Sequence, residues 1–278
     1  MFDSLGDRIK AYENVTNFEL MRRCPIIIRV DGISFSRFTR KLKKPYEPLF
    51  LEAMAQTMLH VASEIGGCVF GYQQSDEITF VLKNDQSLDT EPWYANRIQK
   101  ICSSTASMTS IKLQKNLSNL DLPLIGDGIF DCRVFAVPTI GEAVNCVLWR
   151  QSDAIRNAIS SAAYAILCKN FGKKTALNML HKVTTKDKLE LMTNECGIDF
   201  HEEYPASYRY GVSVYKVPTL IMKKDGSNST RKKWILDWDL PVFSKDRDFI
   251  YNIIHSGSDV IRANIINSNV LNKSNALL

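Results

Sequence analysis

Two acidic clusters, each joined to an apolar run of strand length, constrain the fold of this chain more than any other feature. The first cluster contains Asp31 and Gly32 and ends the apolar run at 25–30. The second contains Asp76 and Glu77 and separates the apolar runs 68–72 and 78–82. Short apolar runs bounded in this way indicate buried strands. The acidic residues are therefore expected at a strand end and in the turn of a hairpin.

This arrangement favours a site for divalent metal ions. Carboxylate oxygens are the ligands that Mg²⁺ prefers, and the ion takes waters and substrate phosphates for the rest of its shell. Two such ions can hold the attacking and leaving oxygens of a phosphoryl transfer. Each cluster alone has an ordinary alternative: Asp-Gly after a strand is common turn chemistry, and the second cluster could be a solvated hairpin tip. Their order, with apolar strands on both sides, favours the metal site.

The composition allows a sizeable core and a nucleic-acid partner. The chain has 278 residues, of which 45% are hydrophobic, so one large domain or two modest ones are expected. The net charge of +5 and the pI of about 8.7 permit binding to nucleic acid without requiring it.

The cysteines and the N-terminus indicate an intracellular chain. The seven cysteines include no C-x-x-C pair and the four histidines no H-E-x-x-H motif, so we expect reduced thiols and no structural zinc. The acidic, polar start predicts no signal peptide. Because no apolar run approaches the roughly 20 residues that span a bilayer, no membrane partner is expected. The expected location is the cytoplasm, with an organelle left open.

The order of the predicted elements suggests the fold. Strands at 25–31, 68–73, 77–83 and 131–137 alternate with helices at 47–65 and 93–115, which gives the order β-α-β-β-α-β. This is the ferredoxin-like split on which polymerase palm domains are built. The predicted fold class is therefore α+β, a palm-like antiparallel sheet with helices packed on it and a C-terminal extension of helices and a hairpin.

The rest of the chain divides into further elements. A helix followed by a short connection is expected over 7–24, further helices over 139–147, 151–170, 174–183 and 186–195, and strands within 210–236. We interpret 1–138 as the palm-like catalytic core. Residues 139–240 would form a helical and hairpin extension of the same globular unit, with tRNA contacts. Residues 241–278 are interpreted as a partly flexible tail.

Three stretches of the chain together resemble the tRNA(His) guanylyltransferase family and its wider set of 3′-to-5′ polymerases. They are residues 29–38, residues 71–77, and residues 130–134 with 149–153. The resemblance extends over about 7–217. It implies that two Mg²⁺ ions are held by Asp31 and Asp76 with the carbonyl of Gly32, and that Glu77 supports the catalytic site.

The resemblance also implies substrates. Members of the family activate a tRNA 5′-monophosphate with ATP or GTP, and the 3′-hydroxyl of an incoming nucleoside triphosphate then attacks the activated end. Such phosphoryl transfer depends on positioning and charge stabilisation, so basic groups should surround the triphosphate. The positions that match family nucleotide contacts are Lys44, Ser75, Arg97, Lys100 and Arg133. By spacing alone, Arg97 and Lys100 could also form a solvated helix face.

One segment departs from the pattern of the enzymes that add a single G to tRNA(His). Those enzymes carry His-Ile-Asn-Asn-Leu-Tyr-Asn where this chain has residues 155–161, and only Asn157 is kept. The usual Arg-Asn after the first Asp-Gly is also missing. Such departures are typical of the guanylyltransferase-like branch, which repairs truncated tRNA 5′ ends by templated addition. The expected tRNA contacts are Asp153, Asn157, Lys188, Lys223, Lys224, Arg231, Lys232 and Lys233, although the basic hairpin 223–233 could be only a solvated turn.

Four functions remain in competition at this point. The leading one is templated 3′-to-5′ repair of the tRNA 5′ end, and the first alternative is addition of a single G to tRNA(His). A cyclase-like palm enzyme acting on free nucleotides is a further alternative. An RNA-binding scaffold with an inactive palm is disfavoured by the three retained carboxylates, whose mutual repulsion needs a metal to offset it. Family resemblance also implies a homotetramer.

Overall fold

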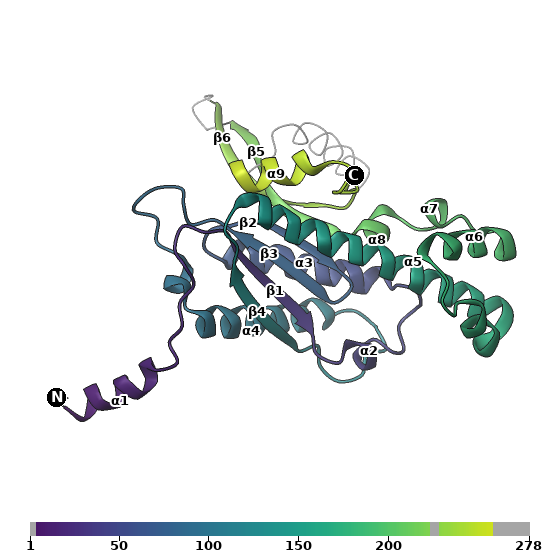
Figure 1. The fold of residues 1–278 in the computed structure, drawn as a ribbon, viewed down its shortest axis with the longest axis horizontal. Coiled ribbons are helices and arrows are strands. Elements are labelled where there is room, and N and C mark those ends of the chain that lie inside the picture. Colours follow the sequence, from purple (N-terminus) through teal and green to yellow (C-terminus); the bar gives the residue numbers. More distant parts are fainter. Residues whose placement is uncertain (1–3, 223–227, 258–278) are drawn as a thin grey trace.

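The protein is a six-stranded antiparallel sheet covered by helices on both faces (Figure 1). The computed structural model describes residues 4–222 and 228–257. The strand order is β4-β1-β3-β2-β5-β6. The strands are β1 (Ile26–Gly32), β2 (Cys68–Gln74), β3 (Glu77–Leu82), β4 (Phe130–Ala136), β5 (Val212–Met222) and β6 (Asn228–Asp237).

The helices follow the predicted alternation in the first half of the chain. They are α1 (Leu5–Asn14), α2 (Phe35–Phe38), α3 (Pro48–Glu64), the 3₁₀ helix η1 (Trp93–Asn96), α4 (Ile98–Leu117), α5 (Ile140–Met179), α6 (Thr185–Cys196), α7 (Phe200–Glu203), α8 (Ala206–Tyr210) and α9 (Arg247–Ser256). The order β1-α3-β2-β3-α4-β4 and the sheet order 4-1-3-2 confirm the ferredoxin-like, palm-like fold class.

One face of the sheet packs against α3 and α4. Alternate residues of β1 point to opposite faces, and Ile26, Ile28 and Val30 lie in one buried cluster with Met54 and Met58 of α3. All five side chains are at most 1% exposed. This apolar layer fixes the register of β1, because a slip by one residue would move Asp31 into the core.

The other face divides into an apolar half and a polar half. Ile27 and Val81 are directly paired and pack against Val144 and Val147 of α5. Farther along the same face, the residues paired across the strands are polar. Arg29 is paired with Thr79 and Arg133, and Asp31 is paired with acidic residues on both sides. The helix therefore covers the apolar end of the face, and the acidic clusters lie at its other end.

Helix α5 is longer than the sequence analysis predicts. Separate helices were expected over 139–147, 151–170 and 174–183, but one element of 40 residues runs from Ile140 to Met179. The residues near 148–150 contain no helix breaker, so nothing ends the first expected helix. The single interruption is Gly172, whose φ of 77° and ψ of 159° are not helical.

The segment 241–278 is only in part the tail that the sequence analysis expects. Residues 247–256 form α9, and Phe249, Ile250, Ile253 and Ile254 are buried in the cluster that contains Ile27. These side chains recur at helical spacing and cover the sheet beside α5 (Figure 1). Residues 241–257 are therefore part of the core structure, while 258–278 lie outside the described residues.

Two features lie at the ends of the molecule. Helix α1 begins two residues before the expected range 7–24, stands away from the sheet (Figure 1) and buries none of its side chains. Helices α6–α8 pack around the far part of α5 through a cluster that includes Ala162, Phe200 and Tyr208.

Within the described residues, no helix is both long enough and apolar enough to cross a membrane.

Candidate active site

Three carboxylates lie in one row across the polar half of the sheet. Asp31 of β1 is paired directly with Glu77 of β3 on one side and with Asp131 of β4 on the other. Neighbouring strands are about 4.8 Å apart, and directly paired residues share a face. Like charges in this position repel one another, so the row needs cations to be stable.

The turn between β2 and β3 adds a fourth carboxylate. Ser75 and Asp76 form a two-residue turn in which the φ of Ser75 is 55°, a left-handed conformation that favours glycine. The Ser75 side chain hydrogen-bonds Asp76 and so lowers its pKa, but burial is the larger effect and the charge of Asp31 adds to it. The pKa of Asp76 is therefore raised. Such local strain at a ligand-binding turn is common at functional sites.

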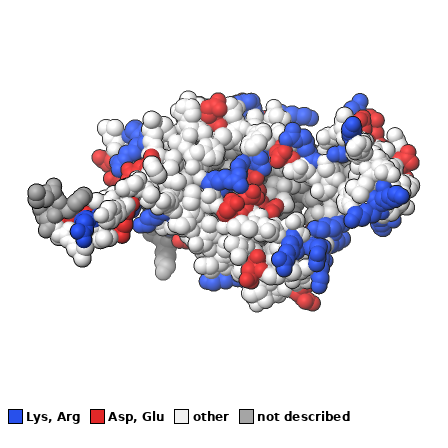
Figure 2. Space-filling view, turned by 60° about the horizontal axis from the view of Figure 1, so that its bottom comes forward, with Lys and Arg blue, Asp and Glu red and all other residues white. Residues whose placement is uncertain are grey.

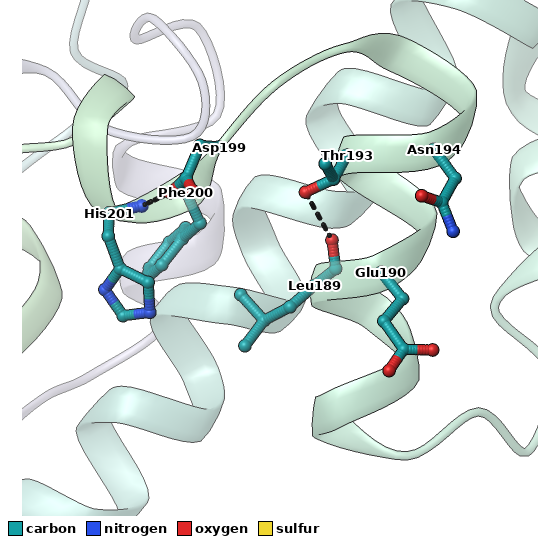
Figure 3. Close-up of a pocket in the computed structure, with 7 residues that line it drawn as sticks. All are labelled: Leu189, Glu190, Thr193, Asn194, Asp199, Phe200 and His201. Carbon is teal, nitrogen blue, oxygen red and sulfur yellow. Dashed lines mark hydrogen bonds between the residues drawn. The ribbon is translucent and has the colours of Figure 1, made fainter.

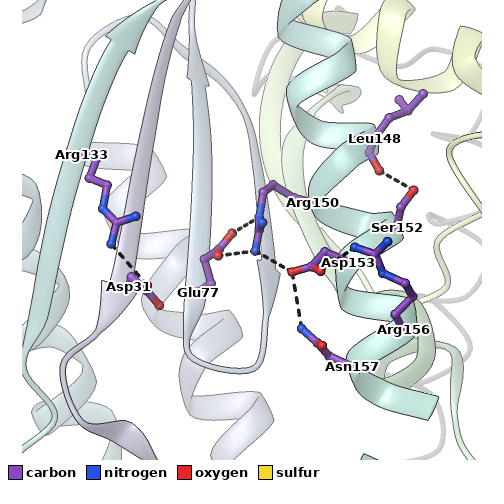
Figure 4. Close-up of polar contacts among 9 residues, drawn as sticks. All are labelled: Asp31, Glu77, Arg133, Leu148, Arg150, Ser152, Asp153, Arg156 and Asn157. Atoms are coloured by element: carbon purple, nitrogen blue, oxygen red, sulfur yellow. Dashed lines mark hydrogen bonds and ion pairs between the residues drawn. The ribbon is translucent and has the colours of Figure 1, made fainter. Parts of the chain in front are cut away.

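Two arginines balance the row of acids from its two sides (Figure 4). The Nη2 atom of Arg133 lies 3.8 Å from a carboxylate oxygen of Asp31 and 3.8 Å from one of Asp131. On the other side, Arg150 of α5 donates two hydrogen bonds of 2.5 Å to the two carboxylate oxygens of Glu77. Burial still outweighs this arginine, so the pKa of Glu77 is raised.

Polar contacts within α5 extend the network that begins at Glu77. Arg150 also lies 3.4 Å from Asp153, which accepts hydrogen bonds from Arg156 at 2.8 Å and Asn157 at 3.5 Å (Figure 4). The hydrogen bond from Arg156 is the largest effect that lowers the pKa of Asp153. The predicted tRNA contacts Asp153 and Asn157 are thus connected to Glu77 through Arg150.

Gly32 ends β1 beside a buried aromatic ring. A Cβ atom at this position would overlap the side chain of Phe35, which packs against Phe38 and Phe130. A residue without a side chain is therefore required where the strand turns into the short helix α2. The backbone of Gly32 directly follows Asp31, as a shared metal site would need.

The donor set fits a hard divalent cation. Asp31, Asp76 and the Gly32 carbonyl supply only oxygen atoms, which suits Mg²⁺ and not a soft metal. The raised pKa of Asp76, caused by burial and by Asp31, marks a place where a cation would relieve repulsion. In the described part of the chain, no three His, Cys, Asp or Glu side chains converge to hold an ion alone. A metal here would need water or phosphate oxygens as further ligands.

The other residues expected to bind nucleotide lie in two places. Lys44 is on the loop after α2, and its Nζ donates to the Thr39 carbonyl at 3.3 Å. Arg97 precedes α4, and its backbone forms an isolated β-bridge with that of Glu19, before the start of β1. Lys100 lies over the Tyr94 ring at 4.7 Å. The carboxylates are at the opposite end of β1. Within one chain, Arg97 and Lys100 are therefore not gathered with Asp31 and Asp76.

The basic residues of the β5–β6 hairpin also lie far from the acidic row. Strand β5 pairs with β2 only over 212–215, and the rest of the hairpin continues past the end of β2 that is opposite Gln74. Arg231, Lys232 and Lys233 lie on this part, and Lys232 Nζ donates to the Ser256 carbonyl at 3.2 Å. The predicted contacts Lys223 and Lys224 lie outside the described residues. Lys188 donates to Ser160 Oγ at 2.9 Å, which joins α6 to α5.

Some residues at the site were not identified from the sequence. Asp131 and Arg150 lie within the stretches that resemble the family, 130–134 and 149–153, but the sequence pattern assigns neither of them to the site. Alternating polar residues at 131 and 133, at the start of an expected strand, could have indicated that Asp131 shares a face with Arg133. Nothing local could have indicated Arg150, because its partner Glu77 is 73 positions away.

The surface carries a cluster of acidic side chains, and a cavity lies elsewhere in the fold. In Figure 2, acidic side chains gather in the middle of one face with basic side chains beside them. A separate cavity of about 230 Å³ lies between α6 and α7, where Thr193 donates to the Leu189 carbonyl and the Asp199 carboxylate accepts from the His201 amide (Figure 3). It brings together no pair of arginine and carboxylate like that at the acidic row.

Comparisons with known proteins agree with this geometry. The profile of the family described as tRNA(His) guanylyltransferase matches residues 6–138. An uncharacterized protein of Acanthamoeba polyphaga mimivirus is 31% identical over 236 aligned positions, and the match covers 77% of each chain. A probable tRNA(His) guanylyltransferase of Dictyostelium discoideum is 29% identical over 237 aligned positions, and the match covers 81% of this chain and 90% of that protein.

Solved structures give the same result. A bacterial tRNA(His) guanylyltransferase-like protein in complex with ATP has a TM-score of 0.76 and 32% identity, over 91% of this chain and 99% of its own. The enzyme from Saccharomyces cerevisiae, at 20% identity and a TM-score of 0.67, supports the fold alone. With its palm-like sheet and acidic row, this chain belongs to the tRNA(His) guanylyltransferase family of nucleotidyltransferases.

Proposed function

We propose that this protein adds nucleotides to the 5′ end of tRNA in the 3′-to-5′ direction, opposite a template base, and so repairs truncated tRNA. The observation that carries the proposal is the pairing of Asp31 with the acidic β2–β3 hairpin at one end of a palm-like sheet. Relatives named tRNA(His) guanylyltransferase, and related structures named as complexes with ATP and with GTP, support tRNA and these nucleotides as substrates.

Two Mg²⁺ ions are proposed as cofactors, with Asp31, Asp76 and the Gly32 carbonyl as their protein ligands. When bound, the ions would stabilise charge on the attacking and leaving oxygens. The protein itself holds Asp31 at the end of β1 and Asp76 in the β2–β3 turn, and Arg133 supplies positive charge beside Asp31. Lys44 and Ser75 are proposed to contact the triphosphate from the same end of the sheet.

The activation and addition steps each exchange one phosphoryl bond. In the first, the tRNA 5′-phosphate attacks ATP or GTP and pyrophosphate leaves. In the second, the 3′-hydroxyl of the incoming nucleotide attacks the activated phosphate and the nucleoside monophosphate leaves. Both steps depend on positioning and charge stabilisation.

Templated repair is favoured over addition of a single G to tRNA(His) by residues 155–161. Ala158 and Ile159 are 2% and 4% exposed and pack in the cluster between α5 and α6–α8. These two side chains are therefore not available to read an anticodon. Arg156, Asn157 and Ser161 are exposed, and of these only Asn157 matches the pattern of the single-G enzymes. Watson–Crick pairing with the opposing base can select the nucleotide without any protein group, as it does in RNA-guided DNA recognition.

The test uses tRNAs that lack the first nucleotide, with each of the four bases in turn opposite the gap. With Mg²⁺, ATP and labelled nucleoside triphosphates, we expect addition of the complementary nucleotide to tRNAs of several identities, and no addition by Asp31→Asn. Addition of G against every base, or only to tRNA(His), would instead support the single-G guanylyltransferase. Product formation from nucleoside triphosphates without tRNA would support an enzyme acting on free nucleotides.

A further inference from the structure

We propose that Arg150 is a positioning residue of this reaction, which fixes the acidic hairpin by holding both oxygens of Glu77 and joins it to Asp153 of α5. The proposal rests on the proposed function and extends it to a residue that contacts neither the metal ligands Asp31 and Asp76 nor the Gly32 carbonyl.

The first argument is the geometry of the pair. Two hydrogen bonds of 2.5 Å, from Nε and Nη2 of Arg150, occupy both carboxylate oxygens of Glu77. The side chains of Arg150 and Glu77 are only 15% and 18% exposed. A bidentate pair with little access to water is strong and directional. The two hydrogen bonds use one lone pair on each oxygen, so a metal ion at Glu77 would have to share the carboxylate with the guanidinium. We therefore assign Glu77 a structural task.

The second argument is that Arg150 itself is held from two other sides. Its guanidinium carbon lies 4.6 Å from the centre of the Trp149 ring, and its Nη2 lies 3.4 Å from Asp153. Asp153 is in turn held by Arg156 at 2.8 Å. With its plane and direction fixed in this way, the guanidinium can define where Glu77 lies.

The third argument is the place of Glu77 in the chain. Glu77 directly follows Asp76 and begins β3, so its side chain fixes the backbone from which Asp76 projects. The turn before it contains Ser75 in a left-handed conformation. Without a fixed partner on α5, the turn could relax and move the Asp76 carboxylate. A displacement of about 1 Å at such a group can cost on the order of 100-fold in rate.

The kinetic test uses Arg150→Lys, which keeps the positive charge but cannot donate two parallel hydrogen bonds to the two carboxylate oxygens. In single-turnover addition to tRNA lacking its first nucleotide, we expect the rate at saturating nucleotide to fall about 10- to 100-fold. The nucleotide concentration for half-maximal rate should change by less than about threefold. Arg247→Gln is the matched control, because Arg247 also contacts α5, at Asn145, but away from the acidic row. Its rate should equal that of the wild type.

A double-mutant cycle and a metal titration separate positioning from other roles. If Arg150 acts through Glu77, Glu77→Gln combined with Arg150→Lys should be no slower than the slower single variant. Mn²⁺ binding, followed by electron paramagnetic resonance without RNA or nucleotide, should weaken less than about threefold in Glu77→Gln and more than tenfold in Asp76→Asn. Thermal unfolding of each variant confirms that it is folded.

Three results would overturn the proposal. They are a wild-type addition rate for Arg150→Lys, multiplication of the two single effects in the double variant, and loss of Mn²⁺ binding in Glu77→Gln. Failure of the proposed function has a different signature. The wild-type protein would then add nothing to any tRNA, while the Mn²⁺ titration would still report whether Glu77 is a metal ligand.

Discussion

Asp76 combines a buried position with a nearby like charge, so its ionised form opposes folding in the metal-free protein. Its pKa is raised by burial and by Asp31, and folding therefore favours the protonated form. The stabilisation is present at low pH and is lost as the pH rises through the raised pKa. Above the raised pKa the metal-free protein carries this unfavourable charge, which a bound cation would offset.

We predict that Asp76→Asn abolishes nucleotide addition and raises the Tm of the metal-free protein at pH 7. The increase should be about 2–4 °C, as expected for roughly 1 kcal/mol in a chain of this size. The increase should shrink as the pH falls through the raised pKa, and it should disappear only below the ordinary carboxyl pKa of about 3.9, where Asp76 is protonated in both the folded and the unfolded protein. Asp89→Asn, in an exposed loop, is the control and should change neither quantity. A Tm for Asp76→Asn below that of the wild type at pH 7 would contradict this account of the site.

Gly32 is restricted by contact and not by an unusual backbone conformation. We predict that Gly32→Ala lowers the free energy of unfolding by about 1–3 kcal/mol, the usual effect of overpacking, because the new Cβ atom must displace the Phe35 ring. Addition should slow as well, because the carbonyl of residue 32 is a proposed metal ligand. Urea denaturation and the tRNA assay measure the two effects.

Gly141→Ala is the control for that substitution. Gly141 lies in the first turn of α5, and the nearest atom to a new Cβ would be Thr139 Oγ1 at 3.6 Å. Alanine in a helix is more favourable than glycine by up to about 1 kcal/mol, so this variant should be as stable as the wild type or more stable. Equal destabilisation by both substitutions would mean that the Phe35 contact is not the cause.

At the scale of elements, α9 makes the end of the described chain part of the core. We predict that Ile253→Ala lowers the free energy of unfolding by about 2–5 kcal/mol, the range for a large buried aliphatic side chain, because Ile253 is fully buried between α9 and the sheet. Tyr251→Ala, on the exposed side of the same helix, should change it by about 0.5 kcal/mol or less. Similar values for the two variants in guanidinium denaturation would show that α9 contributes little to stability.

The elements also show what could be read from the sequence and what could not. Strands β1 to β3 are short apolar runs and β4 alternates polar with apolar residues, so local pattern was enough to predict them and their order. The length of α5 was missed because polar residues at 150–153 interrupt its apolar spacing. Arg150 and Asp153 do so as part of the network at Glu77, whereas Gln151 is buried and bonds to the backbone at 210, 241 and 243. The helix α9 was missed although Ile250, Ile253 and Ile254 have helical spacing, because the polar sequence that follows suggested a tail.

The site was predictable in part for a related reason. Asp31 and Asp76 follow directly from strand ends and a hairpin turn, which are local features. Their partners are not local: Asp131 and Arg150 reach the row through sheet order and helix packing, and both are set by the whole fold. The position of Arg97 and Lys100, at the other end of β1, also depends on the direction of α4 in three dimensions.

At the scale of the whole molecule, metal binding should be visible as stability. We predict that Mg²⁺ raises the Tm of the wild-type protein, because an ion that binds only the folded state adds about 2.7 kcal/mol at 100 times its Kd. EDTA should reverse the rise and stop nucleotide addition. Asp31→Asn and Asp76→Asn should show a much smaller rise in scanning fluorimetry. An equal rise in these variants would place the ion elsewhere.

Helix α5 has a mechanical consequence for a protein built in this way. Between Ile140 and the break at Gly172 it is one rod, whose first part lies on the sheet, whose middle holds Glu77, and whose far part packs with α6–α8. From Arg150 to Ile166 the rod is about 24 Å long, so each degree of tilt at the sheet swings that point by about 0.4 Å. A force on α6–α8, such as that from a docked RNA, would therefore tilt α5. A small part of that movement would reach the acidic hairpin, which α5 holds.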